Sequence, residues 1–199
     1  MSQGIRKIGV IGAGQMGNGI AHVCALAGFP VLINDVSPDR IKDALATING
    51  NMARQISKKR ITEQERQSAL GHIAPATTFD KFGDCDLVIE AVTEREDVKR
   101  KTLSQLCPML KPEAIIGTNT SSISITRLAA AMHDIQLDTI HMMKLAMKGN
   151  IFHCQKTTHD LNCLAHGGQR LAAFNAHITR QRVPPCTDAT DHTVGGKVV

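Results

Sequence analysis

The sequence predicts an α/β fold: a doubly wound, Rossmann-type parallel sheet with a projecting helical hairpin. Three observations predict it. Short β-type apolar runs alternate with amphipathic helical segments through about residue 131. The run at 87–89, continued by Ala91 and Val92, is apolar at successive positions, as expected of a strand buried on both faces. A glycine-rich segment joins the first apolar run, residues 5–11, to the first helical pattern.

That segment has the G-x-G-x-x-G spacing of a phosphate-binding turn and consists of Gly12, Ala13, Gly14, Gln15, Met16 and Gly17. Gly12 allows a tight strand-to-helix turn, Gly14 lets backbone amides approach a pyrophosphate, and Gly17 lets the helix pack closely on the strand. The N-terminus of the helix adds N–H donors and the positive end of its dipole. The sequence therefore predicts a dinucleotide site.

A second strand at 31–34 ends on Asp35, which stands 18 residues after Gly17. A carboxylate at this place accepts hydrogen bonds from an adenosine ribose and repels a 2′-phosphate, so we expect NAD as the cofactor. Two alternatives stay open. Asp35 could be a solvated strand end, and the nearby Arg40 leaves NADP possible.

Two helices follow and predict the hairpin. Ser37 and Pro38 open a helix of about twenty residues, whose buried stripe is Ile41, Leu45, Ile48, Met52 and Ile56. A capping box at 62–65 opens a second helix that Gly71 ends. The turn between them carries Lys58, Lys59 and Arg60. These side chains are either solvated at the tip of the hairpin or bind an anionic group of the substrate. Beyond it we expect a helix at 94–110, a strand at 114–117 and a short helix at 124–132.

Composition narrows the function class. The 199 residues suit one domain with an appendage, and no apolar run approaches the roughly 18 residues of a membrane span. We also see no signal-peptide pattern and expect a cytoplasmic protein that contacts no membrane. The six cysteines form no paired framework, and Cys24, Cys85 and Cys107 are expected to be small buried residues of a reducing compartment. The net charge of +5 is spread out and Trp and Tyr are absent, which argues against nucleic-acid binding.

Three segments, 12–17, 88–94 and 118–122, stand in the order and spacing typical of the NAD-dependent 3-hydroxyacyl-CoA dehydrogenases. The chain resembles this family over about residues 4–131. The resemblance implies an enzyme of fatty acid and butanoate metabolism that oxidises a short-chain 3-hydroxyacyl-CoA to the 3-oxoacyl-CoA with NAD. It also implies a second, helical domain that closes over the substrate and forms a dimer interface.

The resemblance assigns roles to single residues. It places Asp35, Glu94 and Lys99 around the cofactor with the glycine turn, Ser121 and His141 at the reacting oxygen, and Lys58 near the coenzyme A. The chemistry requires a base that takes the hydroxyl proton while hydride leaves carbon, and histidine has a suitable pKa. From the residues alone, Glu94 and Lys99 could be an exposed helix start and Ser121 a helix N-cap.

The pattern departs from the family at the base. His141 lies 20 residues after Ser121, but about six residues that should separate it from Met143, Lys144 and Leu145 are missing. Met147 stands where the family has the glutamate that orients the histidine. An unpartnered histidine is a weaker base, so we expect slow turnover. The alternative is an NAD-binding remnant or regulatory module that turns nothing over.

We divide the chain into an NAD-binding domain at 1–145 and an atypical tail at 146–199. Beyond Asn150 neither helical nor strand periodicity is visible, and the helical domain with its dimer interface is missing from the pattern. We expect a frameshifted or rearranged segment that is poorly ordered. Cys154, His159, Cys163 and His166 could be read as zinc ligands, but their spacing matches no closed site and we predict no metal.

Overall fold

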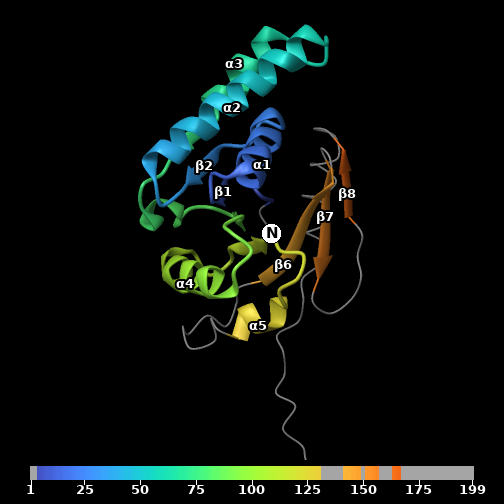
Figure 1. Ribbon diagram of the computed structural model, residues 1–199. Coiled ribbons are helices and arrows are strands. Elements are labelled where there is room, and N and C mark those ends of the chain that lie inside the picture. The colour runs from blue at the N-terminus through green and yellow to red at the C-terminus, as the bar shows by residue number, and fades with distance from the viewer. Residues whose placement is uncertain (1–3, 131–140, 149–150, 157–162, 167–199) are drawn as a thin grey trace, which may run out of the picture.

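The computed structural model describes residues 4–130, 141–148, 151–156 and 163–166. Within these residues one sheet is formed in the order β3-β2-β1-β4-β5-β6-β7-β8 (Figure 1). The first six strands are parallel, and β7 and β8 run antiparallel to their neighbours. The strands are β1 (Ile8–Ile11), β2 (Val31–Asn34), β3 (Ile73–Pro75), β4 (Leu87–Glu90), β5 (Ile115–Thr118), β6 (His141–Lys148), β7 (Ile151–Lys156) and β8 (Cys163–His166).

Helices connect the parallel strands, as the alternating pattern predicted. They are α1 (Gln15–Leu26), α2 (Pro38–Ser57), α3 (Glu63–Gly71), α4 (Glu96–Leu106) and α5 (Ile125–Ala130), with short 3₁₀ turns η1 (Phe79–Phe82) and η2 (Cys107–Met109). The helix expected at 94–110 is thus shorter. Its last turn becomes η2 because Pro108 lacks the N–H that an α-helix needs.

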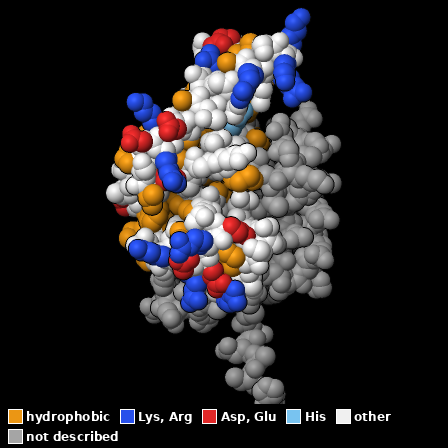
Figure 2. Space-filling model, in the orientation of Figure 1, with side chains coloured by type: hydrophobic (Ala, Val, Ile, Leu, Met, Phe, Trp, Pro, Cys, Tyr) orange, Lys and Arg blue, Asp and Glu red, His pale blue; other side chains and the backbone are white. Residues whose placement is uncertain are grey.

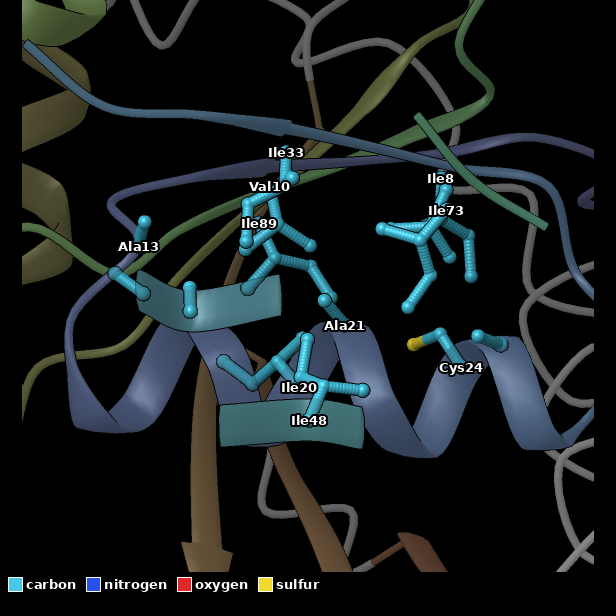
Figure 3. Close-up of a cluster of buried hydrophobic side chains, with 14 of the residues drawn as sticks. Ile8, Val10, Ala13, Ile20, Ala21, Cys24, Ile33, Ile48, Ile73 and Ile89 are labelled. Carbon is cyan, nitrogen blue, oxygen red and sulfur yellow. The ribbon is translucent and has the colours of Figure 1, made fainter. Parts of the chain in front are cut away.

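Successive side chains of each strand point to opposite faces of the sheet, and both faces are covered. Ile8 and Val10 of β1, with Ile33 and Ile89 of the neighbouring strands, pack against α1 and against Ile48 of α2 (Figure 3). The alternate positions face a second cluster with α4, α5, η1 and η2, which contains Ile11, Leu32, Val88, Phe82, Leu103, Leu106, Ile116 and Leu128. The doubly wound Rossmann-type fold is confirmed.

The α2–α3 hairpin projects from the sheet domain, as predicted (Figure 1). Thr62 and Glu65 form the expected capping box: the Thr62 hydroxyl accepts from Glu65 N at 3.2 Å, and Glu65 Oε2 accepts from Thr62 N at 2.7 Å. Lys59 turns the chain with a positive φ of 53°. Figure 2 shows Lys and Arg side chains gathered at the outer end of the hairpin.

The sheet extends further along the chain than the sequence pattern indicated. The expected boundary between residues 145 and 146 falls inside β6, and residues 151–156 and 163–166 of the expected tail are strands. The rest of the tail lies outside the described residues. None of the described helices is long and apolar enough to cross a membrane. Cys24, Cys85 and Cys107 are buried, as expected, and burial raises the pKa values of their thiols to about 12, 12 and 11.

The contact between α1 and the first turn yields a stability prediction. A Cβ added at Gly17 would lie 1.6 Å from the Gly12 carbonyl oxygen, which is backbone and cannot swing aside. Gly17→Ala should therefore lower the free energy of unfolding by about 3 kcal/mol, the upper end of ordinary overpacking. Urea unfolding measures it. Gly50→Ala in α2 is the control: its Cβ meets nothing within 4 Å and should stabilise the helix. Equal stability of the two variants would contradict the close contact.

Candidate cofactor site

Four parallel strands end at one level and define the site. The register pairs Ile11 with both Asn34 and Glu90, and it pairs Glu90 with Thr118. The loops after β1, β2, β4 and β5 therefore emerge side by side. Open parallel sheets bind ligands at the carboxyl ends of their strands, at the place where the strand order reverses. Here that place lies between β1 and β4.

The glycine turn after β1 is packed against the loop after β4. Gly12 has a φ of +101°, and a Cβ on it would lie 2.6 Å from the Ala91 carbonyl oxygen. Gly12 N donates to Asn34 O and Ala91 N donates to Ile11 O, both at 2.7 Å. The predicted reason for glycine at Gly12, the tight turn, is confirmed, as is the close packing at Gly17.

Gly14 faces open space. A Cβ at this residue would meet no atom within 4 Å, so the backbone is accessible from outside. Gly14 is also the N-cap of α1, whose first turn contains no acidic residue. The first N–H groups of a helix have no partner within it, and the positive dipole end favours an anion. This arrangement of Gly14, Gln15 and Met16 fits a pyrophosphate.

Asp35 lies beside this turn and is not merely a solvated strand end. It is half-buried, its Oδ2 accepts from Ala13 N at 2.8 Å, and its Oδ1 accepts from Ser37 N at 3.3 Å. A carboxylate can accept about four hydrogen bonds, so acceptor capacity remains for two ribose hydroxyls. The chain thus holds a carboxylate next to the glycine turn, as an NAD site requires.

A buried ion pair lies beneath the loops after β4 and β5. The side chains of Glu90 and Lys99 are both fully buried, and Lys99 Nζ lies 2.9 and 3.0 Å from the two Glu90 oxygens. The same ammonium donates to Asn119 O at 3.2 Å and to Val92 O at 3.4 Å. Glu90 also accepts from Val92 N at 2.7 Å and from the Thr118 hydroxyl at 2.5 Å.

Glu94 holds the loop that carries Ser121. Its Oε1 accepts from the Thr120 hydroxyl at 2.6 Å, from Ser121 N at 2.9 Å, and from Ser122 N and Oγ at 3.1 and 3.0 Å. Its Oε2 lies 3.5 Å from Lys99 Nζ. Burial raises the pKa of Glu94, but the hydrogen bonds from Thr120, Ser122 and Ser121 outweigh it and bring the pKa to about 2.

Ser121 is exposed and lies in the loop after β5, at the same sheet edge as the glycine turn. The alternative role of helix N-cap belongs to another serine. Ser124 stands just before α5, and its hydroxyl accepts from Arg127 N at 3.4 Å. Glu94, likewise, lies two residues before α4 and binds the serine loop, so it is not a helix-start residue.

The structure does not bring His141 to Ser121. His141 is the first residue of β6 and pairs in register with Ile115, the first residue of β5. Ser121 comes after Thr118, the last residue of β5. The three-residue step from Ile115 to Thr118 corresponds to about 10 Å along the strand. Lys58 is exposed and caps the carboxyl end of α2, at the turn of the hairpin. Figure 1 shows this hairpin projecting from the sheet domain.

The sequence pattern assigns no role to Glu90 or Thr118, and the family resemblance places Lys99 at the cofactor itself. One signal was present: a carboxylate at the end of a strand buried on both faces needs a cation, and Lys99 follows nine residues later. Among the described side chains, no group of three or more His, Cys, Asp and Glu could hold a metal ion. The register places Cys154 opposite Cys163, while His159 lies outside the described residues.

A glycine turn at the switch point of a parallel sheet, with a carboxylate after the second strand, defines a Rossmann-type dinucleotide-binding domain. The family follows from the sequence. Residues 7–145 match the 3-hydroxyacyl-CoA dehydrogenase, NAD binding domain, and the chain belongs to that family. The cofactor of this domain is NAD.

Individual proteins agree with this assignment. The chain is 63% identical to 3-hydroxybutyryl-CoA dehydrogenase from Bradyrhizobium diazoefficiens over 131 residues, which is 66% of this chain and 45% of that protein. A probable 3-hydroxybutyryl-CoA dehydrogenase from Deinococcus radiodurans is 42% identical over 63% of this chain and 45% of its own length. The crystal structure of (S)-3-hydroxybutyryl-CoA dehydrogenase from Ralstonia eutropha matches with a TM-score of 0.73 and 33% identity, covering 88% of this chain and 60% of that one. The match thus spans less than half the length of the Bradyrhizobium diazoefficiens and Deinococcus radiodurans proteins.

The hydrogen bonds to Glu94 predict an acid-sensitive loop. A pKa lowered from 4.5 to about 2 stabilises the fold fully above about pH 4.5 and loses that contribution as the pH falls toward 2. Glu94→Gln should cost about 1 kcal/mol at pH 7, because the side chain is 38% exposed and solvent screens it.

Urea unfolding at pH 7 and pH 3 tests this. The difference between the native protein and Glu94→Gln should shrink at pH 3. Glu113→Gln, at an exposed carboxyl after η2, is the control measured at the same two pH values. An unfolding difference for Glu94→Gln that stays constant between the two pH values would contradict the lowered pKa.

Proposed function

We propose that this chain binds NAD across the carboxyl ends of β1, β2, β4 and β5, and that this NAD serves the oxidation of a short-chain 3-hydroxyacyl-CoA to the 3-oxoacyl-CoA. The observation that carries the proposal is the open space at Gly14 beside the Asp35 carboxylate. The glycine turn supplies N–H donors for the pyrophosphate, and Asp35 supplies acceptors for the adenosine ribose. The family assignment and the two 3-hydroxybutyryl-CoA dehydrogenase relatives support the substrate class.

In this proposal the loops after β4 and β5 serve the reacting end. Bound NAD supplies a hydride acceptor. Ser121 donates a hydrogen bond to the substrate oxygen from an exposed loop that Glu94 holds in place. His141 is the candidate base, as the resemblance implies, although the register of β6 gives this role no support.

Lys58 is the proposed contact to the phosphates of coenzyme A, together with its basic neighbours Lys59 and Arg60 at the hairpin tip (Figure 2). The burial of the cysteines Cys24, Cys85 and Cys107 as thiols supports a reducing compartment, so we place the protein in the cytoplasm. The proposed partners are a short-chain acyl-CoA and neither nucleic acid nor membrane.

A second candidate function is NAD binding without turnover, as in a remnant or regulatory module. One observation favours it: the β5–β6 register places His141 level with Ile115, about 10 Å from the strand ends that carry the site. That backbone offset does not support His141 as the base for an oxygen held by Ser121. Met147 in place of the orienting glutamate points the same way.

The cofactor assignment predicts a preference for NADH over NADPH. Asp35 would face the 2′-phosphate as a like charge, so NADPH should bind at least about tenfold more weakly. Fluorescence titration of both nucleotides measures this. Asp35→Asn keeps the side-chain size and one acceptor oxygen but removes the negative charge. In this variant the affinities for NADH and NADPH should therefore differ less than in the native protein. Equal affinities in the native protein would remove Asp35 from the ribose site.

Gly14 offers a direct test of the phosphate cradle. Gly14→Val adds a side chain into open space, so folding should be unaffected while NADH affinity falls at least about tenfold. Gly50→Val is the matched control, because Gly50 also faces open space but lies on the hairpin. Normal NADH binding by Gly14→Val would show that the pyrophosphate lies elsewhere.

The two candidate functions differ in turnover. We expect acetoacetyl-CoA reduction by NADH to run about 10²- to 10⁴-fold below an ordinary rate of about 10 per second, because the base lacks its partner. Binding of NADH with no measurable turnover would select the second function. A rate near 10 per second would contradict the expectation, and His141→Ala would then show whether His141 is the base.

A further inference from the structure

We propose that Cys154 of β7 and Cys163 of β8 form a reversible disulfide on exposure to a small disulfide such as oxidised glutathione, and that this bond fixes β8 in register on β7. The two residues are register partners across this antiparallel strand pair. The proposal concerns the end of the sheet opposite β3 and does not depend on NAD binding. A failure of one proposal therefore leaves the other standing.

The strand register brings the two residues within disulfide range. Residues directly opposite each other in an antiparallel pair have Cα atoms about 4.5 Å apart at one kind of position and about 5.5 Å apart at the other. A disulfide joins residues whose Cα atoms are about 4.4–6.8 Å apart. Both kinds of position satisfy this range, and opposed residues share one face of the sheet. The pairing of Cys154 with Cys163 therefore meets the backbone requirement of a disulfide.

β8 has few backbone contacts that define its alignment. It contains four residues and is the last strand in the sheet order, beside β7 (Figure 1). An edge strand presents a row of unpaired backbone groups on its outer side. A slip by one residue would move every side chain of the strand to the other face. A bond between Cys154 and Cys163 excludes such a slip, because it requires the register in which these residues are opposed.

The strands around the pair carry positive charge. β6, β7 and β8 together contain Lys144, Lys148 and Lys156 and no acidic residue. Lys156 lies two residues after Cys154 on the same strand, and hence on the same face of the sheet. A lysine beside a cysteine favours the thiolate, which is the form that attacks a disulfide. This part of the sheet therefore suits thiol–disulfide exchange.

The core cysteines differ in this respect. Cys24, Cys85 and Cys107 are each no more than 2% exposed, and burial raises the pKa values of their thiols to about 12, 12 and 11. At neutral pH such thiols contain almost no thiolate, so they react slowly with a disulfide. The sixth cysteine, Cys186, lies outside the described residues and is the competing partner that an experiment must distinguish.

The exchange proceeds in two steps. One protein thiolate attacks a sulfur of oxidised glutathione, so that a protein–glutathione disulfide forms and one glutathione thiolate leaves. The second protein thiolate then attacks the protein sulfur of this mixed disulfide and releases the second glutathione. The two protein thiols lose two electrons, and oxidised glutathione gains them and becomes two molecules of glutathione. The two cysteine protons pass to the released thiolates.

The reducing compartment proposed above makes the bond conditional. In such a compartment thiols are kept reduced, and the disulfides that do form are transient or sense the redox state. The strands β7 and β8 should therefore be joined only while the proportion of oxidised glutathione is raised.

Tryptic peptides of the native protein identify the bond directly. Trypsin cleaves after Lys156, so Cys154 and Cys163 fall into separate peptides, 149–156 and 157–170. The protein is equilibrated with an excess of oxidised glutathione, and remaining thiols are blocked with N-ethylmaleimide at acidic pH. Mass spectrometry without reductant should then show the two peptides joined. Equilibration with an excess of reduced glutathione should separate them.

Two variants distinguish strand register from mere closeness along the chain. Cys163→Ser/Leu164→Cys moves the thiol by one residue, to a position opposite His153 and on the other face of the sheet. At the same glutathione ratio it should give at least about tenfold less of the joined peptides, because its backbone position no longer suits a disulfide. Cys186→Ser is the matched control and should form the bond as the native protein does.

Hydrogen exchange measures the effect on the strands. The amides of residues 151–156 and 163–166 should exchange at least about tenfold more slowly in the oxidised than in the reduced protein, because the bond opposes separation of β7 from β8. Amides of β1 and β2 should exchange equally in both forms, since these strands lie at a distance in the sheet order. In Cys163→Ser the oxidant should not change the exchange of the β7 amides.

Four results would overturn the proposal. Native protein without joined peptides in an excess of oxidised glutathione would show that the register does not bring the thiols together. Predominant joining of either peptide to the one that carries Cys186 would show a different pairing. An equal yield from Cys163→Ser/Leu164→Cys would show that closeness along the chain forms the bond. Unchanged exchange of the strand amides in the joined protein would show that the bond does not fix β8 on β7.

Discussion

Four neighbouring parallel strands, β2, β1, β4 and β5, end at the same level of the sheet, and this alignment determines where the loops of the site lie. Because Ile11, Asn34, Glu90 and Thr118 are paired in register, their loops must leave the sheet through one narrow region. The loop backbones are therefore so close together that there is no room for a side chain between them. Gly12, which has none, lies against the backbone of Ala91. This crowding also collects polar groups that need partners, and it leaves backbone N–H groups at the start of α1 facing outward.

At this edge, carboxylates accept the hydrogen bonds of the loop N–H and hydroxyl groups. Asp35, Glu90 and Glu94 each accept backbone or hydroxyl donors from a neighbouring loop, so every loop is tied to another. At the opposite edge of the sheet, the Asp86 carboxylate likewise accepts hydrogen bonds from the amides of Arg6 and Lys7. The difference is that the carboxyl edge combines these ties with open space at Gly14. A rigid frame around an open position is what a preorganised anion site requires.

Local signals in the sequence were sufficient for much of this. The glycine turn, the capping box at Thr62 and the projecting hairpin each depend on residues close in sequence, and the structure has all three. The hydrogen bond from the Thr118 hydroxyl to Glu90 could not be predicted, because it joins residues 28 apart and depends on strand register. The alignment of β6 with β5, which sets the place of His141 along the strand, has no local signal either. The strands β7 and β8 lack the polar alternation by which exposed strands are recognised.

We propose that NAD lies across the carboxyl ends of β1, β2, β4 and β5. Backbone amide chemical shifts, followed by NMR during an NADH titration, report where the cofactor binds. The largest shifts should fall on the glycine turn and on the loops that follow Asn34, Glu90 and Thr118. Amides at the opposite edge, such as Arg6, Lys7 and Leu87, should not move. Large shifts at that edge or along α3, with none at the glycine turn, would contradict this location of NAD.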